Sequence, residues 1–94
     1  MLIVQKFGGS SVANADRIRN VARIIAESFL YGHEVVVVLS AQGDTTDDLL
    51  EKAAELNANP SKRELDMLLA TGEQQSIALM AMCLESMGLP VVSP

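Results

Sequence analysis

The sequence predicts an α/β fold with helices packed on a mainly parallel sheet. Residues 2–5 and 35–40 are short aliphatic runs that indicate strands, and apolar residues recur at spacings of three and four from Ala15 to Phe29. A strand, an amphipathic helix and a second strand form a βαβ unit, whose strands are parallel and whose crossover is right-handed. The aromatic content of only 3%, beside abundant Ala, Leu, Val and Met, favours the same class.

The first elements carry local signals for their ends. The strand at 2–5 is followed by the pair Gly8-Gly9, which indicates a tight turn. Gly32 stands where a glycine is expected just after a helix. The run VVVVLS at 35–40 has no polar alternation, so we expect this strand to be covered on both faces.

A second group of helices follows a loop at residues 41–44. Thr45 or Thr46 is expected to cap a helix that residues 57–60 interrupt.

Two capping boxes lie further along the chain, Ser61 with Glu64 and Thr71 with Gln74. They predict two separate helices, of which the second ends near Gly88.

Residues 89–93, LPVVS, predict a third strand and complete a set of three strands and four helices. Such a set is part of a three-layer α/β/α domain, because a parallel sheet needs both faces covered. We therefore expect residues 1–94 to be the N-terminal portion of one such domain, and part of a longer chain.

Composition excludes several classes of function. Twelve acidic against seven basic side chains give a net charge of -5, which argues against binding nucleic acid. The apolar runs fall far short of the roughly 20 residues of a membrane-spanning helix. Cys83 is the only cysteine and His33 the only histidine, so neither an intramolecular disulfide nor a zinc cluster is expected, and we expect a reducing, cytoplasmic environment.

Candidate chemistry lies just beyond the two predicted strands, at residues 6–11 and 40–46. Ligands of open α/β sheets collect outside the carboxyl ends of the strands, and paired glycines let backbone amides and a following helix N-terminus approach an anion such as phosphate. Lys6 precedes the glycines, so this is not a Walker A loop. Taken alone, the residues leave open an ordinary strand-to-helix turn with a solvated lysine.

Other candidates have a plain structural interpretation beside the functional one. Hydroxyls of Ser40 and Thr46 could bind a substrate, but a threonine before a helix is also its usual cap. Glu73 is placed in the first turn of a predicted helix, where the macrodipole alone would explain a carboxylate. Cys83 and the methionines are expected to fill the core and His33 to face solvent from a turn; the methionines are Met80, Met82 and Met87.

Three segments together favour the functional interpretation over the structural one. VQKFGGSSV at 4–12, VVVVLSAQGDTTDDLL at 35–50 and LDMLLATGEQQSIALMAM at 65–82 resemble, in this order and spacing, the N-terminal part of aspartokinases of the amino acid kinase superfamily. The SAxGDTTD and TGEQ blocks distinguish this resemblance from acetylglutamate, glutamate and uridylate kinases.

The resemblance implies an ATP- and Mg²⁺-dependent kinase that phosphorylates the side-chain carboxylate of L-aspartate, at the start of lysine, threonine and methionine biosynthesis. It implies a homo-oligomer formed through the full-length chain. It implies that Lys6 is the catalytic residue and stabilises the transferring phosphoryl group. It also implies one set of residues that binds ATP and another that binds aspartate. Those sets are Lys6, Phe7, Gly8, Gly9 and Ser10 for ATP, and Ser40, Thr46 and Glu73 for aspartate.

Some features depart from the family pattern. Gln42 stands where the family often has methionine, and Gln75 where a small aliphatic residue or isoleucine is common. The family's nucleotide pocket and later catalytic residues have no counterpart in residues 1–94, so we expect this piece alone to be inactive. Two alternatives remain, a kinase for another acidic amino acid and a non-catalytic module that binds an anion or associates through its sheet edge.

Overall fold

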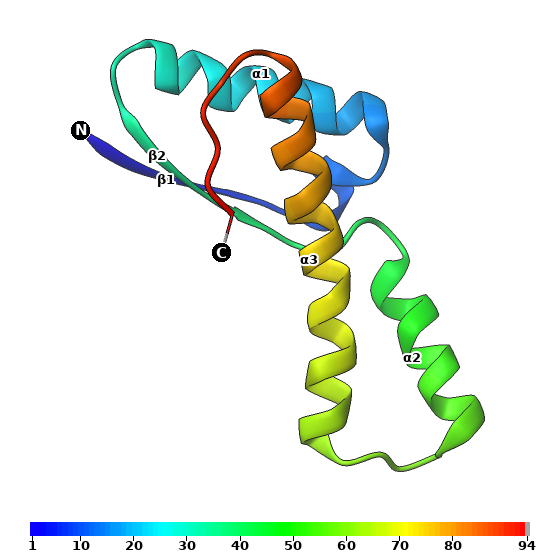
Figure 1. Cartoon of the computed structure of the whole chain (residues 1–94). Coiled ribbons are helices and arrows are strands. Elements are labelled where there is room, and N and C mark those ends of the chain that lie inside the picture. Colours follow the sequence, from blue (N-terminus) through cyan, green and yellow to red (C-terminus); the bar gives the residue numbers. More distant parts are fainter. Residues whose placement is uncertain (94) are drawn as a thin grey trace.

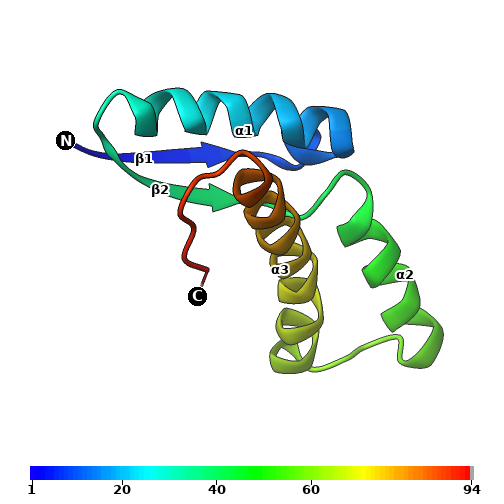
Figure 2. The same ribbon diagram turned by 45° about the horizontal axis from the view of Figure 1, so that its top comes forward.

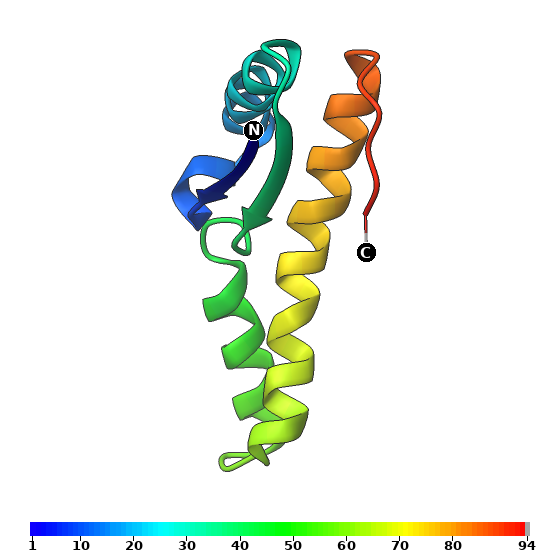
Figure 3. The same cartoon turned by 90° about the vertical axis from the view of Figure 1, so that its left-hand side faces the viewer.

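The computed structural model describes residues 1–93 and confirms the α/β class. Its two strands and first helix lie at one end, beside the second half of the last helix. The first half of that helix and the helix before it extend away as an antiparallel hairpin (Figures 1 and 3). The elements are β1 (Leu2–Phe7), a 3₁₀ turn η1 (Gly9–Val12), α1 (Ala15–Leu30), β2 (Glu34–Leu39), α2 (Thr45–Leu56) and α3 (Lys62–Ser86).

The βαβ unit forms as predicted. β1 and β2 pair in parallel, from Leu2 opposite Glu34 to Phe7 opposite Leu39, and α1 lies along one face of the pair (Figure 2). The Asn14 side chain caps α1 by accepting a hydrogen bond from the Arg17 amide at 3.0 Å. Gly32 follows the helix with φ of +99°, which confirms the predicted C-terminal glycine.

The sheet is covered on one face only, so the prediction for 35–40 was wrong for the described residues. Val35, Val37 and Leu39 point toward a core built mainly by α1 and α3. Val36 and Val38, on the opposite face, are 47% and 44% exposed. Successive side chains of a strand alternate between faces, and both packed helices contribute to the same core, so an all-apolar run does not by itself bury both sides.

The predicted third strand is also wrong, because residues 89–93 make no sheet ladder. The segment runs back beside α3 (Figures 1 and 3). Val91 packs against the core, whereas Val92 is 97% exposed. An apolar groove of about 370 Å³ separates the segment from β2, and Pro90 has no N–H to donate to a ladder.

The two helices predicted between residues 61 and 88 are one continuous helix, α3. Ser61 caps it as predicted, accepting from the Glu64 amide at 3.4 Å. Thr71 caps nothing: its Oγ1 donates to the carbonyl of Leu68 at 2.6 Å, within the helix. Threonine bonds backward in this way inside helices, so a capping box in the sequence need not start one. Near its N-terminus, a hydrogen bond and charge attraction from Asp66 raise the pKa of Lys62.

The start of α2 differs by one residue from the prediction. Asp44 occupies the N-cap position without a side-chain capping bond, and Thr45 and Thr46 are the first two helical residues. The helix ends at Leu56, before the predicted interruption.

Among the core predictions, Met80 and Cys83 are confirmed, since Met80 is buried and Cys83 packs against the core. Met82 and Met87 are exposed instead. His33 is half-buried and stacks on Tyr31, with 6.5 Å between ring centroids. Within residues 1–93, no helix is both long and apolar enough to cross a membrane.

Candidate functional site

The loops after β1 and β2 are bonded to each other at the carboxyl end of the sheet. The amide of Gly43 donates to the carbonyl of Gly9 at 3.1 Å. The side-chain amide of Gln42 donates to the carbonyl of Val12 at 2.9 Å. Parallel pairing brings the two strand ends together, and these bonds hold the loops that follow in one unit.

The two glycines of the first loop are needed for different reasons. A methyl group on Gly9 would lie 2.6 Å from the carbonyl oxygen of Ala41, so close approach of the second loop requires glycine here. A methyl group on Gly8 would meet no atom within 4 Å, and its φ of −78° suits any residue. Neither the packing around Gly8 nor its backbone conformation therefore requires glycine at position 8. The space beside Gly8 is open to a close approach by a ligand.

Hydrogen bonds fix the peptide units of the glycine turn. The amide of Ser11 donates to the carbonyl of Gly8 at 3.1 Å, and the Arg17 guanidinium donates to the carbonyl of Ser10 at 3.0 Å. The Gly9 and Ser10 amides lie at the start of η1, where helix geometry supplies no backbone acceptor. The carbonyls are thus held by the protein while these two N–H groups stay available.

The helix that follows the glycines differs from the prediction. It is the four-residue turn η1, and α1 begins only at Ala15, behind its own cap, Asn14. The positive end of the α1 macrodipole therefore does not lie at the glycine pair. Any anion contact at this loop depends on individual amides and on Lys6.

Lys6 and Phe7 point to opposite sides of the sheet. Lys6 is exposed on the open face, in register with Val38, and no carboxylate of residues 1–93 lies within ion-pair distance of it. Phe7 packs against the core, and its carbonyl accepts from the Ser40 amide at 3.2 Å. Lys6 thus offers a charge at the strand end, whereas Phe7 offers only backbone.

The third segment reaches the same place through Gly72. A methyl group on Gly72 would lie 3.0 Å from Ala41 Cβ and 3.2 Å from Thr45 Cγ2. Glu73 and Thr46 each follow one of these contacting residues in the chain, and both are exposed. Ser40, half-buried, precedes Ala41. The close packing of α3 on the second loop therefore brings the segments of all three substrate candidates to one end of the sheet.

Glu73 does not lie in the first turn of a helix, as the sequence predicted, but near the middle of α3. The macrodipole acts within the first and last turns, so it gives no account of this carboxylate. The plain structural explanation offered for Glu73 is therefore removed.

Two residues of the site escaped the sequence analysis, Arg17 and Gln42. Arg17 was not singled out there, and Gln42 was noted only as a departure from a family pattern. Both act through hydrogen bonds to backbone carbonyls, for which the sequence carries no local signal.

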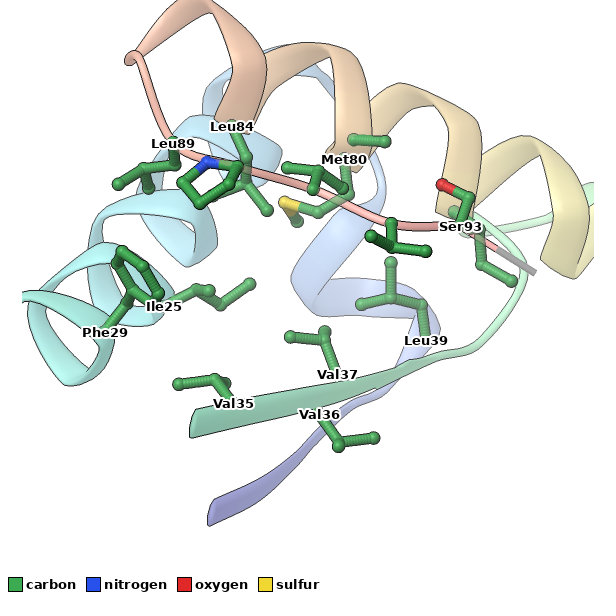
Figure 4. Close-up of a pocket in the computed structure, with 15 residues that line it drawn as sticks. Ile25, Phe29, Val35, Val36, Val37, Leu39, Met80, Leu84, Leu89 and Ser93 are labelled. Carbon is green, nitrogen blue, oxygen red and sulfur yellow. The ribbon is translucent and has the colours of Figure 1, made fainter. Parts of the chain in front are cut away.

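The apolar groove lies elsewhere. Its lining comes from α1, β2, α3 and residues 89–93, including Phe29, Val37, Met80 and Leu89 (Figure 4). None of the predicted site residues lines it. In the part of the chain that the structure describes, no group of three or more His, Cys, Asp or Glu side chains is placed to hold a metal ion.

These features define an α/β protein whose polar loops gather beyond the carboxyl ends of parallel strands, where proteins of this class bind ligands. The model of the amino acid kinase family matches residues 1–93, and the chain belongs to that family.

Named relatives agree. The chain is 59% identical over 87 residues to an aspartokinase of Mycolicibacterium smegmatis, covering 93% of this chain and 21% of that protein. It is 54% identical over 92 residues to an aspartokinase of Geobacillus stearothermophilus, covering 98% and 23%. The crystal structure of aspartate kinase from Synechocystis matches all of this chain and 16% of that one, with a TM-score of 0.97 and 48% identity. The chain thus spans less than a quarter of each relative's length.

Proposed function

We propose that the protein carrying this chain is an aspartate kinase. A side-chain carboxylate oxygen of L-aspartate attacks the γ-phosphorus of ATP, the bond to the β–γ bridging oxygen breaks, and 4-phospho-L-aspartate and ADP form. The similarity to two aspartokinases at 54% and 59% identity supports this activity. With it come roles in lysine, threonine and methionine biosynthesis and homo-oligomeric assembly, which the same resemblance implies. A cytoplasmic location is proposed from the single cysteine.

The observation that carries the proposal is the convergence of three segments at one strand end. The Gly9–Gly43 bond joins the first segment to the second, and the contact of Gly72 with Ala41 joins the third to the second. Phosphoryl transfer depends mainly on placing two anionic substrates in line and offsetting charge that develops on the phosphoryl oxygens. A single site assembled from all three segments meets that requirement.

On the phosphate side, the proposal gives each group a separate task. The exposed Lys6 ammonium stabilises charge on the transferring phosphoryl group, where no carboxylate of residues 1–93 competes for it. The available amides of Gly9 and Ser10 bind phosphate oxygens, and Gly8 leaves room for them to approach. Phe7 contributes through its backbone position only.

On the acceptor side, Ser40 and Thr46 donate hydroxyl hydrogen bonds to aspartate, and Glu73 pairs with its α-ammonium group. All three follow or precede residues in the contact between α3 and the second loop. An exposed carboxylate in the middle of a helix, with no capping or dipole role, suits such a pairing.

Mg²⁺ is expected from the resemblance, and the described residues contain no group of three or more His, Cys, Asp or Glu side chains placed to hold it. Mg²⁺ is commonly held by substrate phosphates and few protein carboxylates. We therefore assign no step of the reaction to the metal through residues 1–93.

The test is ATP-dependent formation of an acyl phosphate by the protein at its natural length, trapped with hydroxylamine. We expect hydroxamate to form with L-aspartate and not with L-glutamate or N-acetylglutamate. Turnover of glutamate instead would favour a kinase for another acidic amino acid. Phosphate or ATP binding without turnover of any of the three would favour the non-catalytic module.

A further inference from the structure

The loop after β2 is held to the glycine turn by one side chain as well as by the backbone. Gln42, half-buried, donates from Nε2 to the carbonyl of Val12 at 2.9 Å, across 30 positions of sequence. The backbone bond from Gly43 to Gly9 lies beside it, at 3.1 Å. The two bonds join opposite ends of η1 to the same loop.

We propose that Gln42 is a positioning residue, which fixes the loop bearing the aspartate-side groups relative to the turn bearing the phosphate-side groups. The expected effect of Gln42 on catalysis rests on the proposed function. Its effect on the position of the loops rests on the geometry alone. Gln42 touches no reacting atom in this account. It acts through the carbonyl of Val12 and, by that bond, on the orientation of η1.

Position and burial support this role. Val12 is fully buried in the core, so its carbonyl is a rigid anchor for the loop. Ala41, next to Gln42, contacts both Gly9 and Gly72 closely. A shift of the loop would therefore move the first and third segments relative to each other, and small misplacements between reacting groups are costly to rate.

Two variants test the bond itself. Gln42→Leu keeps an apolar side chain in this position and has no N–H donor, and Gln42→Glu keeps the shape but places an acceptor opposite the Val12 carbonyl. We expect both to accelerate amide hydrogen exchange of Gly43 and Ser11, by about 2- to 12-fold, the range that one hydrogen bond allows. Gln75→Met, an exposed change on α3, serves as the control and should leave these amides unchanged.

Kinetics then separate positioning from support of the fold. Below the unfolding temperature, Gln42→Leu should lower kcat, by up to about 12-fold, with smaller changes in either KM. Unchanged exchange in both Gln42 variants, or faster exchange with unchanged kcat, would overturn the positioning role. If the unaltered protein does not phosphorylate aspartate, the proposed function fails, and hydrogen exchange still decides whether Gln42 holds the loops together.

Discussion

Gly72 of α3 lies against Ala41 of the loop after β2, so close that a methyl group on Gly72 would be 3.0 Å from Ala41 Cβ. This contact is where the long helix meets the end of the sheet. It explains a glycine in a helix interior, where glycine costs about 1 kcal/mol relative to alanine.

Replacing Gly72 with alanine should push α3 away from that loop. Overpacking costs about 1–3 kcal/mol, and the better helix propensity of alanine offsets about 1 kcal/mol, so we expect a net loss of up to about 2 kcal/mol in the free energy of unfolding. The KM for aspartate should rise as well, because Glu73 moves with the helix. Urea unfolding and steady-state kinetics measure the two effects.

A double-mutant cycle checks the cause. Ala41→Gly removes the nearest atom, so it should restore part of the stability lost in Gly72→Ala. Strict additivity of the two changes would show that this contact does not set the cost.

Gly8 and Gly9 should respond in opposite ways to alanine. Gly9→Ala forces a methyl group to 2.6 Å from a backbone oxygen, so we expect a loss of about 1–3 kcal/mol in the free energy of unfolding. Gly8→Ala meets no clash and should hold or slightly raise stability, yet increase the KM for ATP. Equal loss of stability in both variants would contradict the distinction between packing and ligand access.

Lys6→Ala should lower kcat on the order of 10²–10³-fold, the scale of one electrostatic donor acting on a transition state. Because Lys6 is exposed, the melting temperature should barely change. Lys52→Ala, at an exposed position of α2, removes the same charge away from the site and should leave kcat unchanged. A preserved kcat with a raised KM for ATP would make Lys6 a ground-state anchor instead.

Glu73→Gln tests recognition of the aspartate ammonium group. Loss of a charge-assisted hydrogen bond worth about 1.5–3 kcal/mol should raise the KM for aspartate by about 10- to 150-fold, with ATP parameters nearly fixed. Since Glu73 is exposed and far from the helix ends, stability should not change. Glu85→Gln on the same helix is the control for the aspartate KM, and an unchanged aspartate KM in Glu73→Gln would remove Glu73 from the site.

Local patterns in the sequence were enough to predict the βαβ unit and several element ends. Hydrophobic periodicity fixes α1, and Gly32, Ser61 and Gly88 mark helix ends through bonds and dihedral angles that involve only near neighbours. The polar strand ends were equally visible, because parallel strands must place them together. Three motif segments in order then predicted the family that the comparisons show.

The remaining features depend on contacts between segments that are distant in the sequence. Thr71 bonds inside α3 instead of starting a helix, and the neighbouring Gly72 packs against a loop some 30 residues earlier. Whether 89–93 forms a strand depends on access to the edge of β2, and which valines are buried depends on where helices lie. The bond from Gln42 to Val12 spans 30 positions and exists only after both loops have folded against each other, so no local pattern could reveal it.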